Sequence, residues 1–181
     1  MRIAVTGGIA EGKSTVLATV REMGIPVYSA DDEARILLSN PVWQEKVAAA
    51  LDLPLPLDRA KVRTRILESN EARRALNGLL HRPILDTLLA HPEGFFEVPL
   101  LIETCAMGRF DQVWVATCGL EEQRRRLADR VGDPALAEKL LATQLPTRAK
   151  TPFADLIVRT DRPFACVSEY VRKTVSMNWP R

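Results

Sequence analysis

The sequence lacks long apolar runs and has little net charge. None of its apolar stretches approaches the roughly 18 consecutive residues that a membrane-spanning helix needs, and the opening residues resemble a strand and a turn rather than a signal peptide. We therefore expect neither membrane insertion nor secretion. Lys and Arg number 25 and Asp and Glu 23, which leaves a formal charge of +2. That charge is too small to indicate a nucleic-acid partner.

Cysteine is also scarce, because only Cys105, Cys118 and Cys166 occur, far apart and without a C-x-x-C pair. An odd number of cysteines at such spacing argues against a disulfide framework or a metal site, and we expect three reduced core residues in a cytoplasmic protein. Internal repeats and low-complexity tracts are missing too. With 46% hydrophobic and 27% charged residues, the 181-residue chain is predicted to fold as one domain, residues 1–181.

Five short apolar or β-branched segments alternate with helical patterns along the chain. These candidate strands are residues 3–6, 25–29, 94–98, 112–117 and 154–159. Such alternation predicts an α/β fold with a five-stranded, mostly parallel sheet and helices on both faces. Ligands of these folds bind at the carboxyl ends of the strands.

Two helical segments extend beyond this alternation. Residues 32–91 carry apolar residues at helical spacing, such as Leu76 and Leu80, and contain no convincing strand. We interpret this segment as a helical insertion that closes over one side of the sheet and binds an acceptor. Residues 120–150 are helical and dense in arginine, which predicts a mobile lid.

A phosphate-binding loop follows the first candidate strand. The segment from Gly7 to Ser14 fits G-x-x-x-x-G-K-[ST] and precedes an apolar helical pattern. Its glycines let the backbone wrap around an anion at a helix N-terminus. Lys13 is expected to reach the β- and γ-phosphates of ATP, and Ser14 to hold Mg²⁺. The predicted nucleotide-binding residues are Gly7, Gly8, Ile9, Ala10, Glu11, Gly12, Lys13, Ser14 and Thr15.

This loop occurs in GTPases, in ATP-driven motors and in small-molecule kinases. The guanine-reading Asn-Lys-x-Asp is absent, and the D-x-x-G at residues 129–132 ends a charged helix rather than a buried strand. No apolar strand ends in the Asp-Glu pair typical of motors. The sequence therefore favours a P-loop kinase.

A kinase also needs a carboxylate near the acceptor hydroxyl to take its proton. Asp31 directly follows the second candidate strand, and Arg35 lies four residues further, on the same face of a helix that begins there. Asp32 and Glu33 are interpreted as ordinary acids of a first helical turn.

Together these motifs resemble the dephospho-CoA kinase family over residues 3–158. The resemblance rests on their order and spacing: the Thr-Gly-Gly-Ile start of the loop, Asp31 with Arg35, the segments 79–84 and 99–103, Asp111, a lid pattern of Gln123, Arg126, Leu127 and Arg130, and then Gln144, Lys150 and Asp155.

The resemblance implies Mg²⁺-dependent transfer of the ATP γ-phosphate to the ribose 3′-hydroxyl of dephospho-CoA. Asp31 would be the base, and Lys13 and the lid arginines Arg126 and Arg130 would act on the transferred group. The acceptor pocket would be lined by Asp31, Arg35, His81, Pro99, Leu100 and Glu103.

Several positions depart from the family pattern, three of them near the expected nucleotide and acceptor sites. Ala10 and Glu11 stand where the family has Gly-Ser, and Ser29 replaces its first aspartate. A carboxylate beside a triphosphate is electrostatically unfavourable unless it points to solvent. Two alternatives therefore stay open: another P-loop kinase, acting on a nucleoside monophosphate or another small alcohol, and a nucleotide-binding protein without transferase activity.

Overall fold

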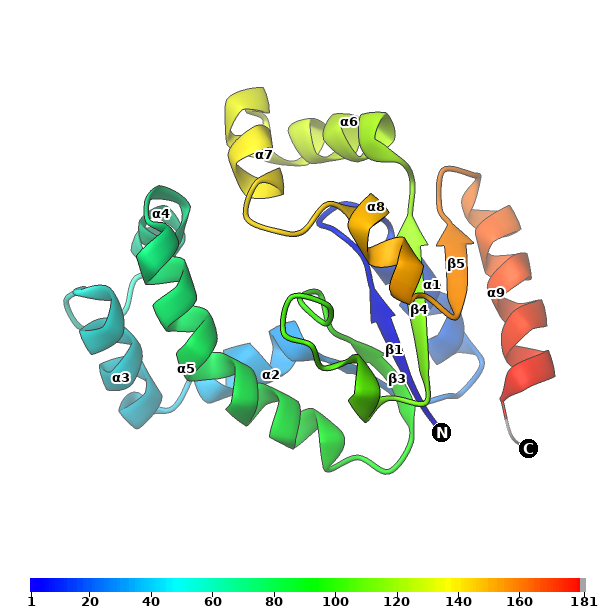
Figure 1. Cartoon of the computed structure of the whole chain (residues 1–181), viewed down its shortest axis with the longest axis horizontal. Coiled ribbons are helices and arrows are strands. Elements are labelled where there is room, and N and C mark those ends of the chain that lie inside the picture. Colours follow the sequence, from blue (N-terminus) through cyan, green and yellow to red (C-terminus); the bar gives the residue numbers. More distant parts are fainter. Residues whose placement is uncertain (180–181) are drawn as a thin grey trace. The chain divides into compact units, whose positions relative to one another are not determined.

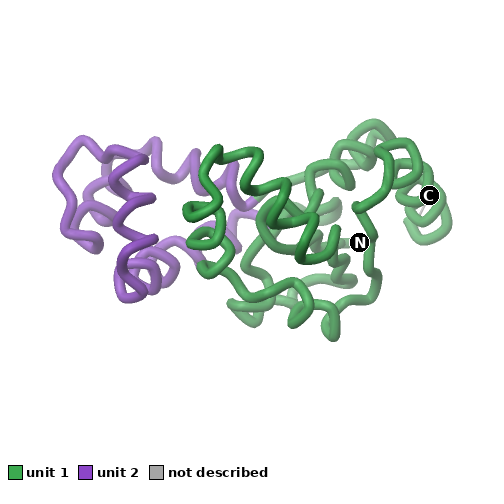
Figure 2. The backbone as a smooth tube through the Cα atoms, turned by 90° about the horizontal axis from the view of Figure 1, so that it is seen from above, with its two compact units in different colours: residues 1–29, 91–181 green, residues 30–90 purple. Residues whose placement is uncertain are grey.

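The computed structural model describes residues 1–179, which form two compact units (Figure 2). The first unit joins Met1–Ser29 with the chain from His91 onward, and the second is Ala30–Ala90. The second unit agrees within two residues with the predicted helical insertion, but it separates as a unit of its own.

A five-stranded sheet forms the centre of the first unit. Its strands are β1 (Arg2–Thr6), β2 (Val27–Ser29), β3 (Gly94–Glu97), β4 (Gln112–Thr117) and β5 (Leu156–Arg159), in the order β2-β3-β1-β4-β5. Every neighbouring pair is parallel. All five predicted strands are confirmed, although β2 and β5 begin two residues later than expected, and the sheet is wholly rather than mostly parallel.

The central strands β1, β3 and β4 are apolar and buried on both sides, which explains this parallel sheet. Ile3, Phe95 and Trp114 lie in a core against α1 (Lys13–Glu22) and α9 (Phe164–Asn178). Helix α8 (Thr147–Lys150) packs against β4 and lies on the other side of the sheet from α1 in Figure 1. Both faces of the sheet therefore carry helices, as predicted.

The predicted lid forms helices α6 (Leu120–Val131), α7 (Pro134–Leu141) and α8. Helix α6 ends at Gly132, whose φ of 70° places it in the left-handed region that favours glycine. This confirms the D-x-x-G segment as a helix end. The Asp133 carboxylate then caps α7 by accepting hydrogen bonds from two backbone amides of its first turn. Short 3₁₀ turns occur at Met107–Arg109 and Thr151–Phe153.

The second unit is helical throughout, as predicted. It contains α2 (Ala30–Leu37), α3 (Pro41–Leu51), α4 (Arg59–Glu68) and α5 (Asn70–Leu89). Val47, Leu51, Ala72 and Leu80 form its own buried core. Within residues 1–179, none of the helices combines the length and the apolar character needed to cross a bilayer.

Candidate active site

The phosphate loop connects β1 to the N-terminus of α1. Gly12 caps the helix with φ 83°, and a Cβ there would lie 2.6 Å from the Thr160 hydroxyl oxygen. A Cβ on Gly7, whose φ is 139°, would lie 2.4 Å from the carbonyl oxygen of Ala116. Both positions therefore require glycine. The backbone amides that begin α1, together with the helix dipole, make this loop an anion site.

Lys13 and Ser14 begin α1 at this anion site. The Lys13 side chain is buried, and its Nζ donates to the carbonyl oxygens of Gly8 at 2.9 Å and Gly7 at 3.1 Å. The ammonium is thus held over the loop, at the start of the helix. Ser14 is exposed in the first turn, so its hydroxyl is accessible to a ligand.

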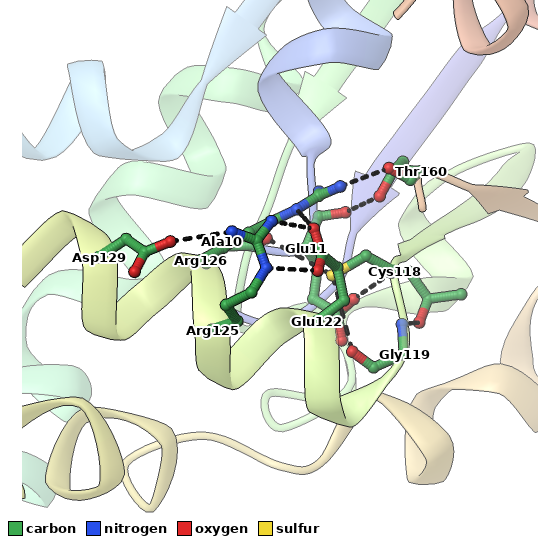
Figure 3. A network of polar contacts seen from close by, with 10 residues as sticks. Ala10, Glu11, Cys118, Gly119, Glu122, Arg125, Arg126, Asp129 and Thr160 are labelled. Carbon is green, nitrogen blue, oxygen red and sulfur yellow. Dashed lines mark hydrogen bonds and ion pairs between the residues drawn. The ribbon is translucent and has the colours of Figure 1, made fainter. Parts of the chain in front are cut away.

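The carboxylate of Glu11 is buried beneath the loop. Glu11 is 1% exposed, and its Oε2 accepts a 2.5 Å hydrogen bond from the backbone N–H of Cys118, directly after β4 (Figure 3). The sequence leaves open whether this carboxylate lies beside the phosphates or in solvent, and the structure shows that it is not in solvent. A backbone donor brought close by the sheet gives the carboxylate a buried partner instead.

Cys118 contacts the loop a second time through its thiol. Its Sγ lies 3.7 Å from the carbonyl oxygen of Ala10. Burial, reinforced by the neighbouring Glu11 charge, raises the pKa of this thiol to about 12, so the thiol remains a protonated donor. Cys105 and Cys166 are exposed, and all three cysteines are free. The prediction of three core cysteines is thus correct only for Cys118.

The base of the lid is fastened to the first residues of the loop. Gln123 Nε2 donates to the Ile9 carbonyl at 2.8 Å, and Gln144 Oε1 accepts from the Ile9 N–H at 2.9 Å. Thr147 Oγ1 accepts from the Gly8 N–H at 3.1 Å. A cavity of about 660 Å³ opens beside these contacts, lined in part by Gln123 and Thr147. The sequence pattern includes both glutamines, but it gives no signal for Thr147.

The arginines of α6 have separate surroundings. Arg126 Nε lies 2.7 Å from Glu122, and its NH2 donates to the Thr160 carbonyl at 2.8 Å. Arg125 pairs with Glu122 and Asp129 on the helix surface (Figure 3). The hydrogen bond from Arg125, followed by that from Arg126, lowers the pKa of Glu122 to about 2.

Arg126 therefore reaches the segment after β5 in this structure, whereas Arg130 is exposed at the far end of α6. The action of these two arginines on a phosphoryl group stays a prediction.

The segment after β3 is tied to the lid by a buried lysine. Lys150 is fully buried, and its Nζ lies 2.8 Å from Glu103 Oε1 and donates to the Pro99 carbonyl at 2.9 Å. Glu103 also accepts a 3.0 Å hydrogen bond from the Leu145 N–H, and the Thr6 hydroxyl donates to Pro99. Glu103 therefore bonds to Leu145 and Lys150, near the C-terminal end of the predicted lid. The resemblance implies only that Glu103 lines the acceptor pocket.

A carboxylate that sequence reasoning missed lies at the carboxyl edge of the sheet. Glu97 ends β3, and its Oε2 accepts from the Ser29 hydroxyl at 3.2 Å at the end of β2. Glu97 supplies a carboxylate beside the position where Ser29 replaces the expected aspartate. The sequence signal that could have identified Glu97 is its position as the acidic residue directly after the apolar pair Phe95-Phe96. Among the described residues, no group of three or more His, Cys, Asp or Glu side chains forms a metal cluster.

Three of the predicted site residues belong to the helical second unit. Asp31 is exposed in the first turn of α2, and Arg35 NH2 lies 2.6 Å from Asp32 Oδ1 in an exposed ion pair. Asp32 and Glu33 are acids of this first turn, as predicted. His81 is half-buried on α5.

A phosphate loop after the first strand of this parallel sheet, followed by a helical lid, defines a P-loop kinase. A shikimate kinase from Aquifex aeolicus shares the fold, with a TM-score of 0.57 at 19% identity over 98% of both chains. A crystal structure from Thermus thermophilus is more similar, with a TM-score of 0.84 at 26% identity, covering 100% of this chain and 98% of the other.

The family itself follows from the sequence comparison. Residues 1–165 match the model of the dephospho-CoA kinase family. A dephospho-CoA kinase from Synechococcus elongatus is 34% identical over 194 aligned positions, covering 96% of this chain and 92% of its own length. The chain belongs to the dephospho-CoA kinase family, and it is an ATP-dependent kinase.

Proposed function

We propose that this chain transfers the γ-phosphoryl group of ATP to the ribose 3′-hydroxyl of dephospho-CoA, giving coenzyme A and ADP. The observation that carries the proposal is a complete phosphate loop, with Lys13 held over it, in a chain that matches the family over residues 1–165. The backbone amides at the start of α1 would bind the phosphates, and the Lys13 ammonium would turn from the loop carbonyls to the β- and γ-phosphates.

The nucleotide would bring Mg²⁺, which neutralises charge on the phosphates when bound. Hard oxygen donors suit this ion, and the described chain offers two at the carboxyl edge of the sheet: the exposed hydroxyl of Ser14 and the carboxylate of Glu97. We assign Ser14 to the ion and add Glu97, whose carboxylate would help to hold it.

Asp31 would take the proton of the 3′-hydroxyl as its oxygen attacks the γ-phosphorus and the bond to ADP breaks. Its exposure in the first turn of α2 leaves the carboxylate accessible to an acceptor. Arg126 and Arg130 would stabilise charge on the transferred group once the lid closes. The acceptor would be bound by Arg35, His81, Pro99, Leu100 and Glu103.

The partners we propose are therefore small molecules, ATP and dephospho-CoA, rather than nucleic acid or a membrane. The free thiols of all three cysteines fit a reducing compartment. We accordingly place the protein in the cytoplasm.

The test is a coupled ADP-release assay with dephospho-CoA, a panel of nucleoside monophosphates, and no acceptor. We expect ADP release only with dephospho-CoA, and loss of this activity in Lys13→Ala. Turnover with a nucleoside monophosphate instead would establish a different P-loop kinase. ATP binding without turnover of any acceptor would establish a nucleotide-binding protein that lacks transferase activity.

A further inference from the structure

The phosphate loop contains a backbone conformation that its sequence does not favour. Ala10 has φ 62°, in the left-handed region. A Cβ atom crowds the following carbonyl in this region, so the conformation costs free energy for every residue except glycine. Such strain persists only where the surrounding structure holds the backbone in place.

Three hydrogen bonds hold the Ala10-Glu11 segment from outside the loop (Figure 3). The Cys118 thiol is shared between the carbonyl oxygens of Ala10 and Gly119, at 3.7 Å from each, and the Cys118 amide donates to the Glu11 carboxylate. On the other side, the Thr160 hydroxyl donates to the Glu11 carbonyl at 2.7 Å. Of the three, the short bond to a buried carboxylate is charge-assisted and therefore the strongest.

Both external donors are themselves fixed to the sheet. Cys118 directly follows β4, and the backbone N–H of Thr160 donates to the Thr117 carbonyl at 2.8 Å. Arg126 of α6 donates a hydrogen bond to the Thr160 carbonyl. Glu11 thus connects a strained loop to the end of β4 through its side chain and to the segment after β5 through its backbone carbonyl.

We propose that Glu11 is a positioning residue that holds the phosphate loop in its nucleotide-binding conformation and offsets the strain at Ala10. The role is geometric, because the carboxylate is occupied by the Cys118 amide. The inference deepens the proposed function and rests only on the part of it in which this loop binds ATP. Without the hydrogen bond between the Glu11 carboxylate and the Cys118 amide, the loop would relax to another conformation. Nucleotide binding would then have to restore the loop, which would weaken the affinity.

The experiment measures ADP binding by calorimetry in the full chain without any acceptor, for Glu11→Ala, Glu11→Gln, Ala10→Gly and the double variant Ala10→Gly/Glu11→Ala. We expect Glu11→Ala to weaken ADP about tenfold or more, the usual scale for a lost hydrogen bond to a charged group. Glu11→Gln keeps an oxygen acceptor for Cys118 and should weaken ADP much less. Glycine at position 10 removes the strain and should restore much of the affinity lost in Glu11→Ala.

The kinetic signature separates positioning from a general loss of stability. In steady-state assays, Glu11→Ala should raise the KM for ATP more than it lowers kcat, because ATP binding restores the loop before the chemical step. Glycine at position 10 should restore ADP affinity without restoring the melting temperature by the same proportion. Glu22→Ala, which breaks an exposed ion pair between Glu22 of α1 and Arg172 of α9, is the matched control and should leave ADP binding unchanged.

Three results would overturn the proposal: ADP affinity of Glu11→Ala equal to that of the unmodified chain, equal losses in Glu11→Gln and Glu11→Ala, or no recovery on adding Ala10→Gly. If Glu11→Ala does not fold, the same comparison is made with Glu11→Ser. Because ADP binding involves no acceptor, a failure to phosphorylate dephospho-CoA would refute the proposed reaction and leave this test intact.

Discussion

Replacing Lys150 by methionine should destabilise the first unit and loosen the segment after β3. The Nζ of Lys150 is buried between the Glu103 carboxylate at 2.8 Å and the Pro99 carbonyl at 2.9 Å. Methionine fills a similar volume but donates to neither oxygen. Breaking a buried ion pair from one side costs about 3–5 kcal/mol. The Glu103 side chain is 21% exposed and regains some hydration, so we expect about 2–4 kcal/mol.

The measurement is urea unfolding followed by circular dichroism for Lys150→Met, Glu103→Gln and the double variant. Glu103→Gln should cost at least as much as Lys150→Met, because it leaves the fully buried Lys150 ammonium without a counter-charge, even though the amide oxygen still accepts from Lys150 and from the Leu145 N–H. The two changes should couple by roughly 1 kcal/mol or more, as contacting residues do. A loss below about 1 kcal/mol in Lys150→Met would show that the pair contributes little. Additive losses would show that the two side chains act independently.

Three further predictions concern the phosphate loop, the base and the lid. Lys13→Ala should abolish phosphoryl transfer and leave the circular dichroism spectrum intact, because a cation is lost and no core apolar residue changes; unchanged turnover at saturating ATP would contradict the role of the loop. Asp31→Asn should lower kcat roughly 100-fold or more with ATP affinity nearly unaltered, and a larger effect from Asp32→Asn would show that the base is the neighbouring residue. The pKa of Glu122, lowered to about 2 from 4.5, means that its ion pairs stabilise the folded chain above pH 4.5 and that this contribution is lost as the pH falls from 4.5 toward 2. The difference in melting temperature between the unmodified chain and Glu122→Gln should therefore be largest near neutral pH and should close in acid.

Local patterns predict much of this fold. The apolar runs that form β1 to β5 are short, bounded by turns and separated by helical segments. Each can therefore be recognised as a strand from the local sequence alone. The phosphate loop is equally local, because its glycines and Lys13 act within eight consecutive residues. The helical character of residues 30–90 follows from periodicity, whereas its separation as a compact unit depends on which contacts form across the chain.

Long-range partners could not be predicted in the same way. The bond between Glu11 and Cys118 joins residues 107 positions apart, and that between Lys150 and Pro99 spans 51. Sequence reasoning identified Glu11 as unusual but left its surroundings open, because an exposed carboxylate and a buried, hydrogen-bonded one have the same sequence in a loop motif. Only the register of β1 beside β4 brings the Cys118 amide within reach.

The lid contacts restrict which part of residues 120–150 can move. Gln123 near its start and Gln144 with Thr147 near its end all bond to the backbone of Gly8 or Ile9. If a closing motion preserves these bonds, only the residues between Gln123 and Gln144 can move. These residues form the C-terminal part of α6 and all of α7. Arg130 lies in that outer part, whereas Arg126 is bonded to the segment after β5. Lid closure would therefore displace Arg130 much further than Arg126, and the two arginines, predicted as one pair, would reach the transferred group by different routes.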